Sequence, residues 1–468
     1  MTIRRGIAIL AVLALPAGCT VGPDYVAPDV AVPDSYGAEA PLPATAAAPT
    51  GGWWTGFMDP RLDHFVDMAL SGNLDIAAAV ARLAQAQAQV RVVNSGRYPA
   101  FDGTIGGDYE RRLTGESTRA ATAEASAGLG LAWQPDVFGR QFRALQAAQA
   151  EAVRQAALRD DLARRTIAAV ARTYIELRRS AARLELIDTS LDLQLQTLDI
   201  VRQRQGAGLA AELDVSRAAA EVAGTRARSG PVTLSLETAR NVLAVLTGNM
   251  PHGIEITDEA VVPVYAGGPD IGAPRLLLRR RPDIAAAEAN LIAATATIGI
   301  AEAELYPAFA LAGDVTASIS DLSPGGVVKS VIGGLSAAIG VPLFDAGGRR
   351  AQVDFSVAGA QEALYTYRQT LLTALQEVET ALVAIQSATL QRDNLREAVE
   401  ASESAFRQAS ALYREGLASF IDILDAQRTL ISNRQSLVDA ESDLAIAVVD
   451  LYTAVGAPVR PAVDRPDL

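Results

Sequence analysis

The sequence is poor in the side chains from which most active sites and metal centres are built. Among 468 residues it has one cysteine, Cys19, and two histidines, His64 and His252. A single cysteine excludes an intrachain disulfide, and so few thiolate and imidazole ligands argue against a metal cluster. No glycine-rich phosphate loop, nucleophile elbow or HExxH pattern is present. We therefore expect no enzyme, no cofactor and no bound metal.

Aromatic side chains and lysine are scarce as well. Aromatic residues make up 5% of the chain although 50% is hydrophobic, so the apolar content is mostly Ala, Leu and Val, which suits long, closely packed helices. Lys329 is the only lysine, the formal net charge is −13, and no basic run occurs. This balance argues against nucleic acid as a partner.

The N-terminus has the three-part layout of a secretory signal. Two arginines precede an apolar stretch over residues 7–15, which is too short to cross a bilayer as a helix, and small residues lead into Cys19. We predict a signal peptide over residues 1–18 and lipidation of Cys19 in what looks like a bacterial lipobox. Pro16 stands where such boxes usually have leucine, so an unlipidated secretory signal with an incidental cysteine is the alternative.

The residue after the cysteine bears on location. Thr20 stands where an aspartate would resemble an inner-membrane retention signal, so the outer membrane is favoured. No run of 18 consecutive apolar residues occurs in the chain. The mature protein can then cross a membrane only as strands.

A set of residues recurs at a constant spacing of 208 positions. The pairs are Asp75 and Asp283, Tyr98-Pro99 and Tyr306-Pro307, Gly208-Leu209 and Gly416-Leu417, Asp214 and Asp422, and Gly248 and Gly456. A constant spacing over about 170 residues indicates duplication of a whole structural unit.

The duplication divides the mature chain into five parts. They are an N-terminal lipidated arm and equatorial segment (residues 19–60), repeat 1 (61–250), a linker (251–274), repeat 2 (275–457) and a C-terminal tail (458–468).

Each repeat is predicted to contain the same elements in the same order. An Ala-rich helix comes first, over residues 62–94 and 282–305, and the Tyr-Pro pair ends it because proline disfavours a helical residue before it. Two strands of ~10 residues follow, which is long enough to cross a bilayer when tilted. The four predicted strands are residues 101–110, 125–134, 309–319 and 331–343.

A very long helix comes next in each repeat, followed by a second helix that turns back. The first long helix can run from about residue 141 to 205, roughly 100 Å. A seven-residue series supports coiled-coil packing in both copies: Val170, Leu177, Leu184, Leu191 and Leu198, then Val378, Ile385, Arg392, Val399 and Phe406. Glycines at 206, 208 and 416 break the helices where a helical hairpin would turn.

Four strands cannot close a barrel, and an open edge in lipid would leave costly unpaired backbone groups. Three chains would supply twelve strands and close the helices into a tube. The predicted fold is therefore mainly α with a small β part: a trimeric α-helical barrel continuous with a 12-stranded outer-membrane β-barrel, four strands per chain, with an internal two-fold repeat.

These features resemble the outer-membrane factors of tripartite efflux systems, specifically the NodT-like efflux lipoproteins of the TolC superfamily. The motifs that carry the resemblance are the residues from Cys19 to Tyr25, Trp53-Trp54, Arg281 to Ile284 with Ala287-Glu288, and Leu424 to Arg428. The resemblance implies a homotrimer in outer-membrane lipid that meets a periplasmic adaptor and an inner-membrane pump of the RND type.

The resemblance also assigns the hairpin turns to the periplasmic tip, where they would contact the adaptor and form the gate. The residues concerned are Gly206, Gly208, Leu209, Glu212, Asp214, Gly416, Leu417 and Asp422. Ala210 and Ala418 stand where relatives carry an acidic residue, so an acidic ring at this level is in doubt, with Glu212 a partial replacement. Asp214 and Asp422 are equally expected to cap helices.

Other residues have structural interpretations. Asp75 and Asp283 are expected to cap the first helix of each repeat. Trp133, Phe138, Tyr306 and Phe344 flank predicted strands and are expected to form an aromatic girdle at the membrane surface, with core packing as the alternative.

The function predicted from these observations is passive conduction of efflux substrates through the outer membrane. Two alternatives remain: an exit duct for secreted proteins, and a lipid-anchored periplasmic coiled-coil scaffold without a pore. The acidic composition predicts an electronegative lumen that prefers cations.

Overall fold

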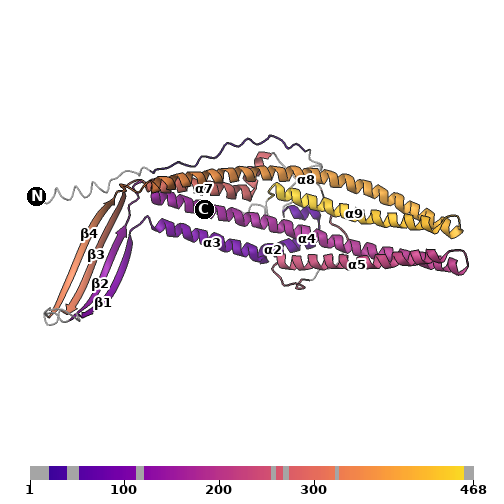
Figure 1. The fold of residues 1–468 in the computed structure, drawn as a ribbon, viewed down its shortest axis with the longest axis horizontal. Coiled ribbons are helices and arrows are strands. Elements are labelled where there is room, and N and C mark those ends of the chain that lie inside the picture. The colour runs from indigo at the N-terminus through magenta and orange to yellow at the C-terminus, as the bar shows by residue number, and fades with distance from the viewer. Residues whose placement is uncertain are drawn as a thin grey trace. The chain divides into compact units, whose positions relative to one another are not determined.

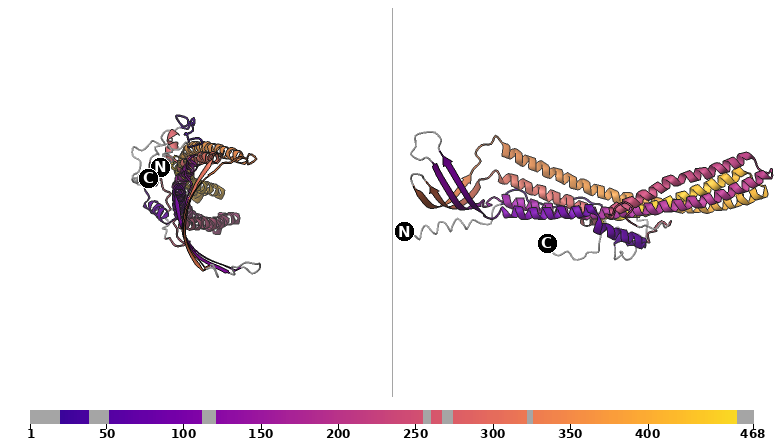
Figure 2. Two further views of the ribbon diagram at one scale, coloured as in Figure 1. Left: turned by 90° about the vertical axis from the view of Figure 1, so that its left-hand side faces the viewer. Right: turned by 90° about the horizontal axis from the view of Figure 1, so that it is seen from below.

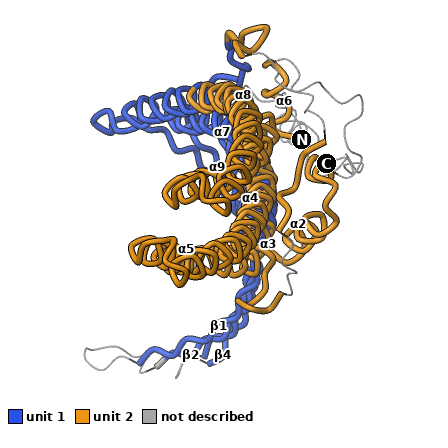
Figure 3. The backbone as a smooth tube through the Cα atoms, turned by 90° about the vertical axis from the view of Figure 1, so that its right-hand side faces the viewer, with its two compact units in different colours: residues 1–30, 81–156, 286–368 blue, residues 31–80, 157–285, 369–468 orange. Residues whose placement is uncertain are grey.

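The structure is a computed structural model that describes residues 20–38, 52–111, 121–254, 260–266, 274–321 and 326–457. The predicted signal peptide, Cys19 and the C-terminal tail lie outside these residues. The chain divides into two compact units (Figure 3). Unit 1 takes in the described residues of Met1–Val30, Ala81–Ala156 and Ala286–Arg368, and unit 2 those of Ala31–Val80, Ala157–Ala285 and Gln369–Leu468. Each unit therefore draws on both predicted repeats.

Unit 1 contains one four-stranded antiparallel sheet. The strands are β1 (Ala100–Arg111), β2 (Ala121–Trp133), β3 (Ala308–Asp321) and β4 (Val327–Gly340), and they lie in that order across the sheet (Figure 1). The sheet is visibly curved (Figure 2). All four predicted strands are confirmed. The last strand ends at Gly340, earlier than predicted, because Pro342 has no N–H to donate to a ladder.

The register gives the sheet two faces of different chemistry. Leu129 of β2 pairs with Gly103 of β1 and with Val315 of β3, so these three residues lie on the same face. Every second residue along each strand lies on that face, and the residues between them lie on the other. The apolar face carries Phe101, Ile105, Tyr109, Leu129, Leu131, Val315, Val331, Leu335 and Ile339, and its charged residues Arg111, Asp321 and Lys329 lie toward the hairpin-turn ends of the strands. The acidic face carries Asp102, Asp108, Glu110, Glu124 and Asp314 among mostly small residues, and its large apolar side chains are Val328 and Ile332 of β4.

Four helices connect with this sheet. α3 (Leu74–Ser95) leads into β1 and α7 (Pro282–Ala303) into β3. The strand hairpins are followed by α4 (Arg140–Gly206) and α8 (Gly348–Glu415). By length and composition α7 is apolar enough to cross a membrane, and 44% of its most apolar window is buried inside the chain.

Unit 2 holds the C-terminal parts of α4 and α8 together with the helices that turn back from them. These are α5 (Glu212–Leu246) and α9 (Phe420–Ala454). The shorter elements are η1 (Trp53–Phe57), α2 (Pro60–Gly72), η2 (Pro274–Leu276) and α6 (Leu277–Arg280). The predicted long helices are confirmed, since α4 has 67 residues and α8 has 68. None of the ten residues of the heptad series is exposed.

The repeat is visible in the element boundaries. α3 and α7 begin at Leu74 and Pro282 and end at Ser95 and Ala303, so both boundaries differ by 208 residues. α5 and α9 differ by the same number at both ends, from Glu212 to Phe420 and from Leu246 to Ala454. The two copies therefore have matching secondary structure over these helices.

The predicted cap at Asp75 is wrong. The helix predicted over residues 62–94 is interrupted at Asn73, whose side-chain Oδ1 accepts the backbone N–H groups of Asp75 (2.9 Å) and Ile76 (3.0 Å). Asn73 also donates to the carbonyl of Leu246, which ties the cap to the end of α5. Asp75 lies instead in the first turn of α3, where its charge favours the positive end of the helix dipole.

The cap at Asp283 is correct only in part. α7 begins one residue earlier, at Pro282, and the Asp283 carboxylate accepts the N–H of Ile284 (2.9 Å). The same carboxylate is held by Arg281, at 3.0 Å from Nε and 2.5 Å from Nη2. Burial is the largest single influence and raises the pKa of Asp283, but the hydrogen bonds and charge of Arg281, with the charge of Arg164 and the Ile284 N–H, together lower it, so the carboxylate stays charged. Its main partner is therefore a buried arginine.

Candidate functional site

The turn between α4 and α5 contains most of the residues predicted at the first tip. Gly206 ends α4, and Gly208 has φ of +73°, a conformation that glycine adopts without strain. This allows the N–H of Leu209 to bond back to the carbonyl of Arg204 at 2.8 Å. The Leu209 side chain is 67% exposed.

The acidic residues of this turn contact neighbouring residues of the same helical hairpin. Glu212 begins α5 and accepts a hydrogen bond from Gln205 at 3.3 Å. Asp214 lies in the first turn of α5 and pairs with Arg217 at 3.7 Å. Its side chain is not the helix cap, because Ala211 precedes the helix without a side-chain hydrogen bond.

The second tip repeats this geometry. Gly416 has φ of +80°, and the N–H of Leu417 bonds to the carbonyl of Leu412 at 2.8 Å. Leu417 is 72% exposed, like its counterpart in the first tip. Asp422 accepts from the hydroxyl (2.6 Å) and the backbone N–H (2.8 Å) of Ser419, and these bonds lower its pKa. Ser419 is therefore the cap of α9, and Asp422, expected as the cap, takes part only as the third helical residue of a capping box.

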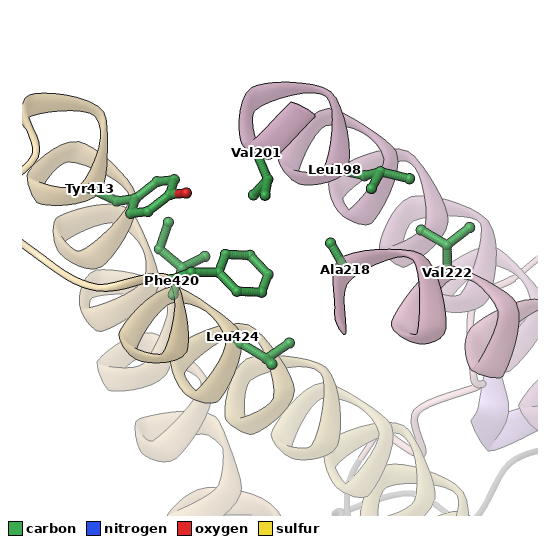
Figure 4. Close-up of a cluster of buried hydrophobic side chains, with 8 residues drawn as sticks. Leu198, Val201, Ala218, Val222, Tyr413, Phe420 and Leu424 are labelled. Carbon is green, nitrogen blue, oxygen red and sulfur yellow. The ribbon is translucent and has the colours of Figure 1, made fainter. Parts of the chain in front are cut away.

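An apolar cluster joins the two hairpins close to these turns (Figure 4). We call it the tip cluster; it consists of Leu198, Val201, Ala218, Val222, Tyr413, Phe420, Ile423 and Leu424. All eight are buried, and they come from α4, α5, α8 and α9. The two hairpins of one chain are therefore held together by a small core of their own.

Polar contacts reinforce the tip cluster. The Arg204 guanidinium donates to the carbonyls of Tyr413 (2.8 Å) and Arg414 (3.2 Å) and lies 4.7 Å from the Tyr413 ring centre. Farther from the turns, Arg428 of α9 forms an ion pair with Glu221 of α5. We call the Arg204 contacts and the Glu221–Arg428 pair the tip latch. The sequence motifs did not reveal Arg204, Tyr413 or Glu221, because no local pattern distinguishes them from other polar residues of long helices.

The predicted aromatic girdle comes together only in part. Phe138 stacks on Tyr306 with ring centres 4.8 Å apart, and Phe309 lies 6.5 Å away. The Trp133 indole donates to the carbonyl of Arg97 at 3.0 Å, and Phe344 is 91% exposed. The four residues all lie in unit 1, at or near the places where strands and helices join, where an interface girdle would be placed.

The N-terminal arm is bound at the same junction. Arg143 of α4, whose side chain is 3% exposed, donates to the carbonyls of Val21 (3.1 Å) and Gly22 (2.9 Å). Its third contact is the Asp24 carboxylate at 2.8 Å. The Val21 N–H in turn bonds to the carbonyl of Phe138. The chain directly after Cys19 is therefore fixed beside the aromatic residues, which the sequence motif by itself did not reveal.

Two strand hairpins of membrane-crossing length, each followed by a long helical hairpin, define the class of the protein: a channel-forming membrane subunit. The profile of the outer membrane efflux protein family matches residues 65–249 and 273–457. The two matches begin, and also end, 208 residues apart, which is the spacing of the repeat.

Individual relatives agree over nearly the whole chain. It is 32% identical to nodulation protein T of Rhizobium leguminosarum bv. viciae, over 98% of this chain and 95% of that protein. It is 29% identical to the cation efflux system protein CusC of Escherichia coli strain K12, over 94% and 96%. The solved structure of the outer-membrane channel OprN matches with a TM-score of 0.85 and 32% identity, over 95% of this chain and 100% of that chain.

The chain belongs to the outer membrane efflux protein family. Members of this family are channels rather than enzymes; they form trimers with a helical barrel and a β-barrel, and they work with an adaptor and an inner-membrane pump. The predicted family, fold class, outer-membrane location and efflux function are confirmed.

Replacing Arg143 by alanine should release the N-terminal arm. The change removes three hydrogen bonds from a charged donor, each worth about 1.5–3 kcal/mol, so the N–H of Val21 should exchange with deuterium at least ~10-fold faster. Hydrogen exchange with mass spectrometry of the arm peptide measures this. The matched control is Arg140→Ala, on the same helix as Arg143, which removes an exposed ion pair with Glu304. An arm that stays protected in Arg143→Ala would contradict this role.

Proposed function

We propose that the efflux channel opens where the two hairpins of each chain separate at the tips, and that the adaptor binds these tips. The observation that carries the proposal is the tip cluster with its latch, which joins α4 and α5 to α8 and α9 within one chain. The exposed Leu209 and Leu417, at matching places in the two turns, offer apolar contacts to a partner helix.

Opening then has a definable energetic cost. Separation of the hairpins breaks the Arg204 hydrogen bonds, at about 1.5–3 kcal/mol each, and exposes part of the tip cluster. The Glu221–Arg428 pair is half-exposed on the arginine side and adds only about 0.2–1 kcal/mol. Taking the channel from 1% to 99% open requires ~5.5 kcal/mol of preferential binding to the open state, which the adaptor would supply.

We further propose that the apolar face of the sheet contacts lipid and the acidic face lines the water-filled lumen. The apolar face bears large side chains such as Ile105 and Leu335, 92% and 84% exposed in one chain, which lipid would cover. The acidic face supplies five carboxylates and no cationic side chain among the described strand residues. That distribution supports an electronegative lumen that prefers cations.

The anchor and the partners complete the proposal. The contacts of Val21 support lipidation of Cys19. Arg143 donates to the Val21 carbonyl and the Val21 N–H bonds to Phe138, so the residues just after Cys19 lie at the expected membrane interface. The inner-membrane partner is proposed to be an RND-type pump. Purification of the trimer from cells after crosslinking tests this; co-purification of an ATP-driven transporter instead would favour the protein-secretion alternative.

Removal of the latch should favour the open channel. In the double variant Arg204→Ala, Glu221→Gln, loss of the Arg204 hydrogen bonds and the ion pair should raise the open fraction at least ~10-fold, because a tenfold shift corresponds to about 1.4 kcal/mol. Single-channel recording in planar bilayers measures the open fraction. Arg202→Ala, an exposed arginine on the same helix, is the control. An unchanged open fraction in a folded trimer would exclude a gating role for the latch.

An arginine on the apolar face should block insertion, whereas one on the opposite face should not. Leu129→Arg places a charge in lipid at a cost of about 2–4 kcal/mol near the bilayer centre. Thr104 follows Gly103, the residue that pairs with Leu129, and therefore lies on the opposite face of the sheet. Thr104→Arg should insert almost normally. The amount of heat-resistant trimer in outer-membrane fractions measures both. Equal loss in the two variants would refute the assignment of the faces.

A further inference from the structure

A pocket lies in unit 1 where the sheet meets the helices. Its volume is about 600 Å³, which is in the range of small-molecule binding sites. Its lining comes from three joins between strand and helix: from β2 to α4 (residues within 134–141), from α7 to β3 (within 303–309) and from β4 to α8 (within 340–349). All of these residues belong to unit 1. The pocket is therefore a feature of this unit alone.

The register of the sheet relates this pocket to the lipid-facing side proposed above. Phe309 lies an even number of residues from Val315 along β3, so both side chains lie on the apolar face. The ring centre of Phe309 is 6.5 Å from that of Phe138, which stacks on Tyr306, and all three residues line the pocket. An aromatic wall of this kind is typical of the membrane interface.

The N-terminal arm reaches the edge of the pocket. Thr20 packs so closely on Gly139 that a Cβ atom on Gly139 would meet the Thr20 side chain. Gly139 stands between two lining residues, Phe138 and Arg140. Cys19, the residue proposed to carry lipid, directly precedes Thr20. The pocket therefore lies beside the place where the proposed lipid anchor leaves the chain, which is the headgroup level of the periplasmic leaflet.

Two cationic and two anionic residues line the pocket. They are Arg140 and Arg349, and Asp136 and Glu304. The side chains of Arg140, Arg349 and Glu304 are 50%, 41% and 38% exposed, so these groups are accessible to a ligand. Asp136 is already engaged, because it accepts the backbone N–H of Phe142 at 2.8 Å. The formal charges cancel, so the lining suits a ligand that has both an anionic and a cationic group.

We propose that this pocket binds the headgroup of a zwitterionic phospholipid that carries a phosphate and a primary ammonium group. Arg349 and Arg140 donate to the phosphate oxygens, because the guanidinium fork matches phosphate geometry. Glu304 accepts from the ammonium group, and the rings of Phe138 and Tyr306 cover the glycerol carbons. The proposal rests on the lipid-facing assignment of the apolar face and names the lipid at its periplasmic edge.

Binding exchanges existing ion pairs for new ones. Arg349 pairs with Asp345 at 3.2 Å, and Arg140 pairs with Glu304 at the same distance. Both pairs are partly exposed, and such pairs contribute little to stability. The guanidinium groups can therefore turn to a phosphate at small cost, and the Glu304 carboxylate is then left for the ammonium group.

Native mass spectrometry of the detergent-purified, full-length trimer tests the site. The probes are phosphatidylethanolamine and phosphatidylglycerol with the same acyl chains, and only the first has an ammonium group. Arg349→Gln should weaken retention of phosphatidylethanolamine at least ~5-fold, since it removes one cation from the phosphate. The matched control is Arg350→Gln, which removes the same charge from the next, exposed residue and should retain the lipid as the wild type does.

A change of headgroup preference gives a second test. The wild type should retain phosphatidylethanolamine at least ~5-fold better than phosphatidylglycerol, and Glu304→Gln should abolish or reverse this preference because it removes the acceptor for the ammonium group. Phosphoethanolamine, the same headgroup without acyl chains, should not displace the lipid at equal concentration. Displacement would assign the pocket to a soluble phosphate ester and overturn the lipid site.

The outcomes separate this site from the proposed function. A wild type that retains both lipids equally, with no change in Arg349→Gln or Glu304→Gln, overturns the headgroup site and leaves the lipid-facing sheet intact. A trimer that retains neither lipid, together with normal insertion of Leu129→Arg, overturns the assignment of the faces as well.

Discussion

The structure depends above all on the need to pair every backbone N–H and C=O group of strands that lie in hydrocarbon. β1 and β4 form the two edges of the sheet in the described part of the chain. An unpaired polar group in lipid costs several kcal/mol, and β1 alone has 12 residues, so a single chain cannot be stable there. Closure of twelve strands from three chains removes both edges, which makes the oligomer a consequence of backbone chemistry.

The internal repeat places matching helices in different surroundings. Although α4 and α8 are copies, positions buried in one are exposed in the other, as Ile175 (0%) and Val383 (55%) show. The copies have diverged where the contact differs in kind. Ion pairs such as Arg183–Asp439 join α4 to α9, and neutral residues stand at the matching positions of α8 and α5.

Features with a long period in the sequence could be predicted, and features set by tertiary contact could not. The heptad series, the Tyr-Pro stops and the glycine turns gave α4, α8 and all four strands nearly to their ends. The break at Asn73 was missed because asparagine within an Ala-rich stretch gives no periodic signal, and its capping depends on the distant Leu246. Arg143 and Arg204 act through carbonyls more than 100 residues away, so no local motif identifies them.

The central claim is that three copies of this chain close a single channel. Single-particle imaging of the detergent-purified full-length protein, together with its native mass, tests that claim most directly. We predict a mass of three chains and a threefold tube with a continuous lumen. A monomer, or a rod of packed helices without a lumen, would contradict the account and favour a lipid-anchored scaffold.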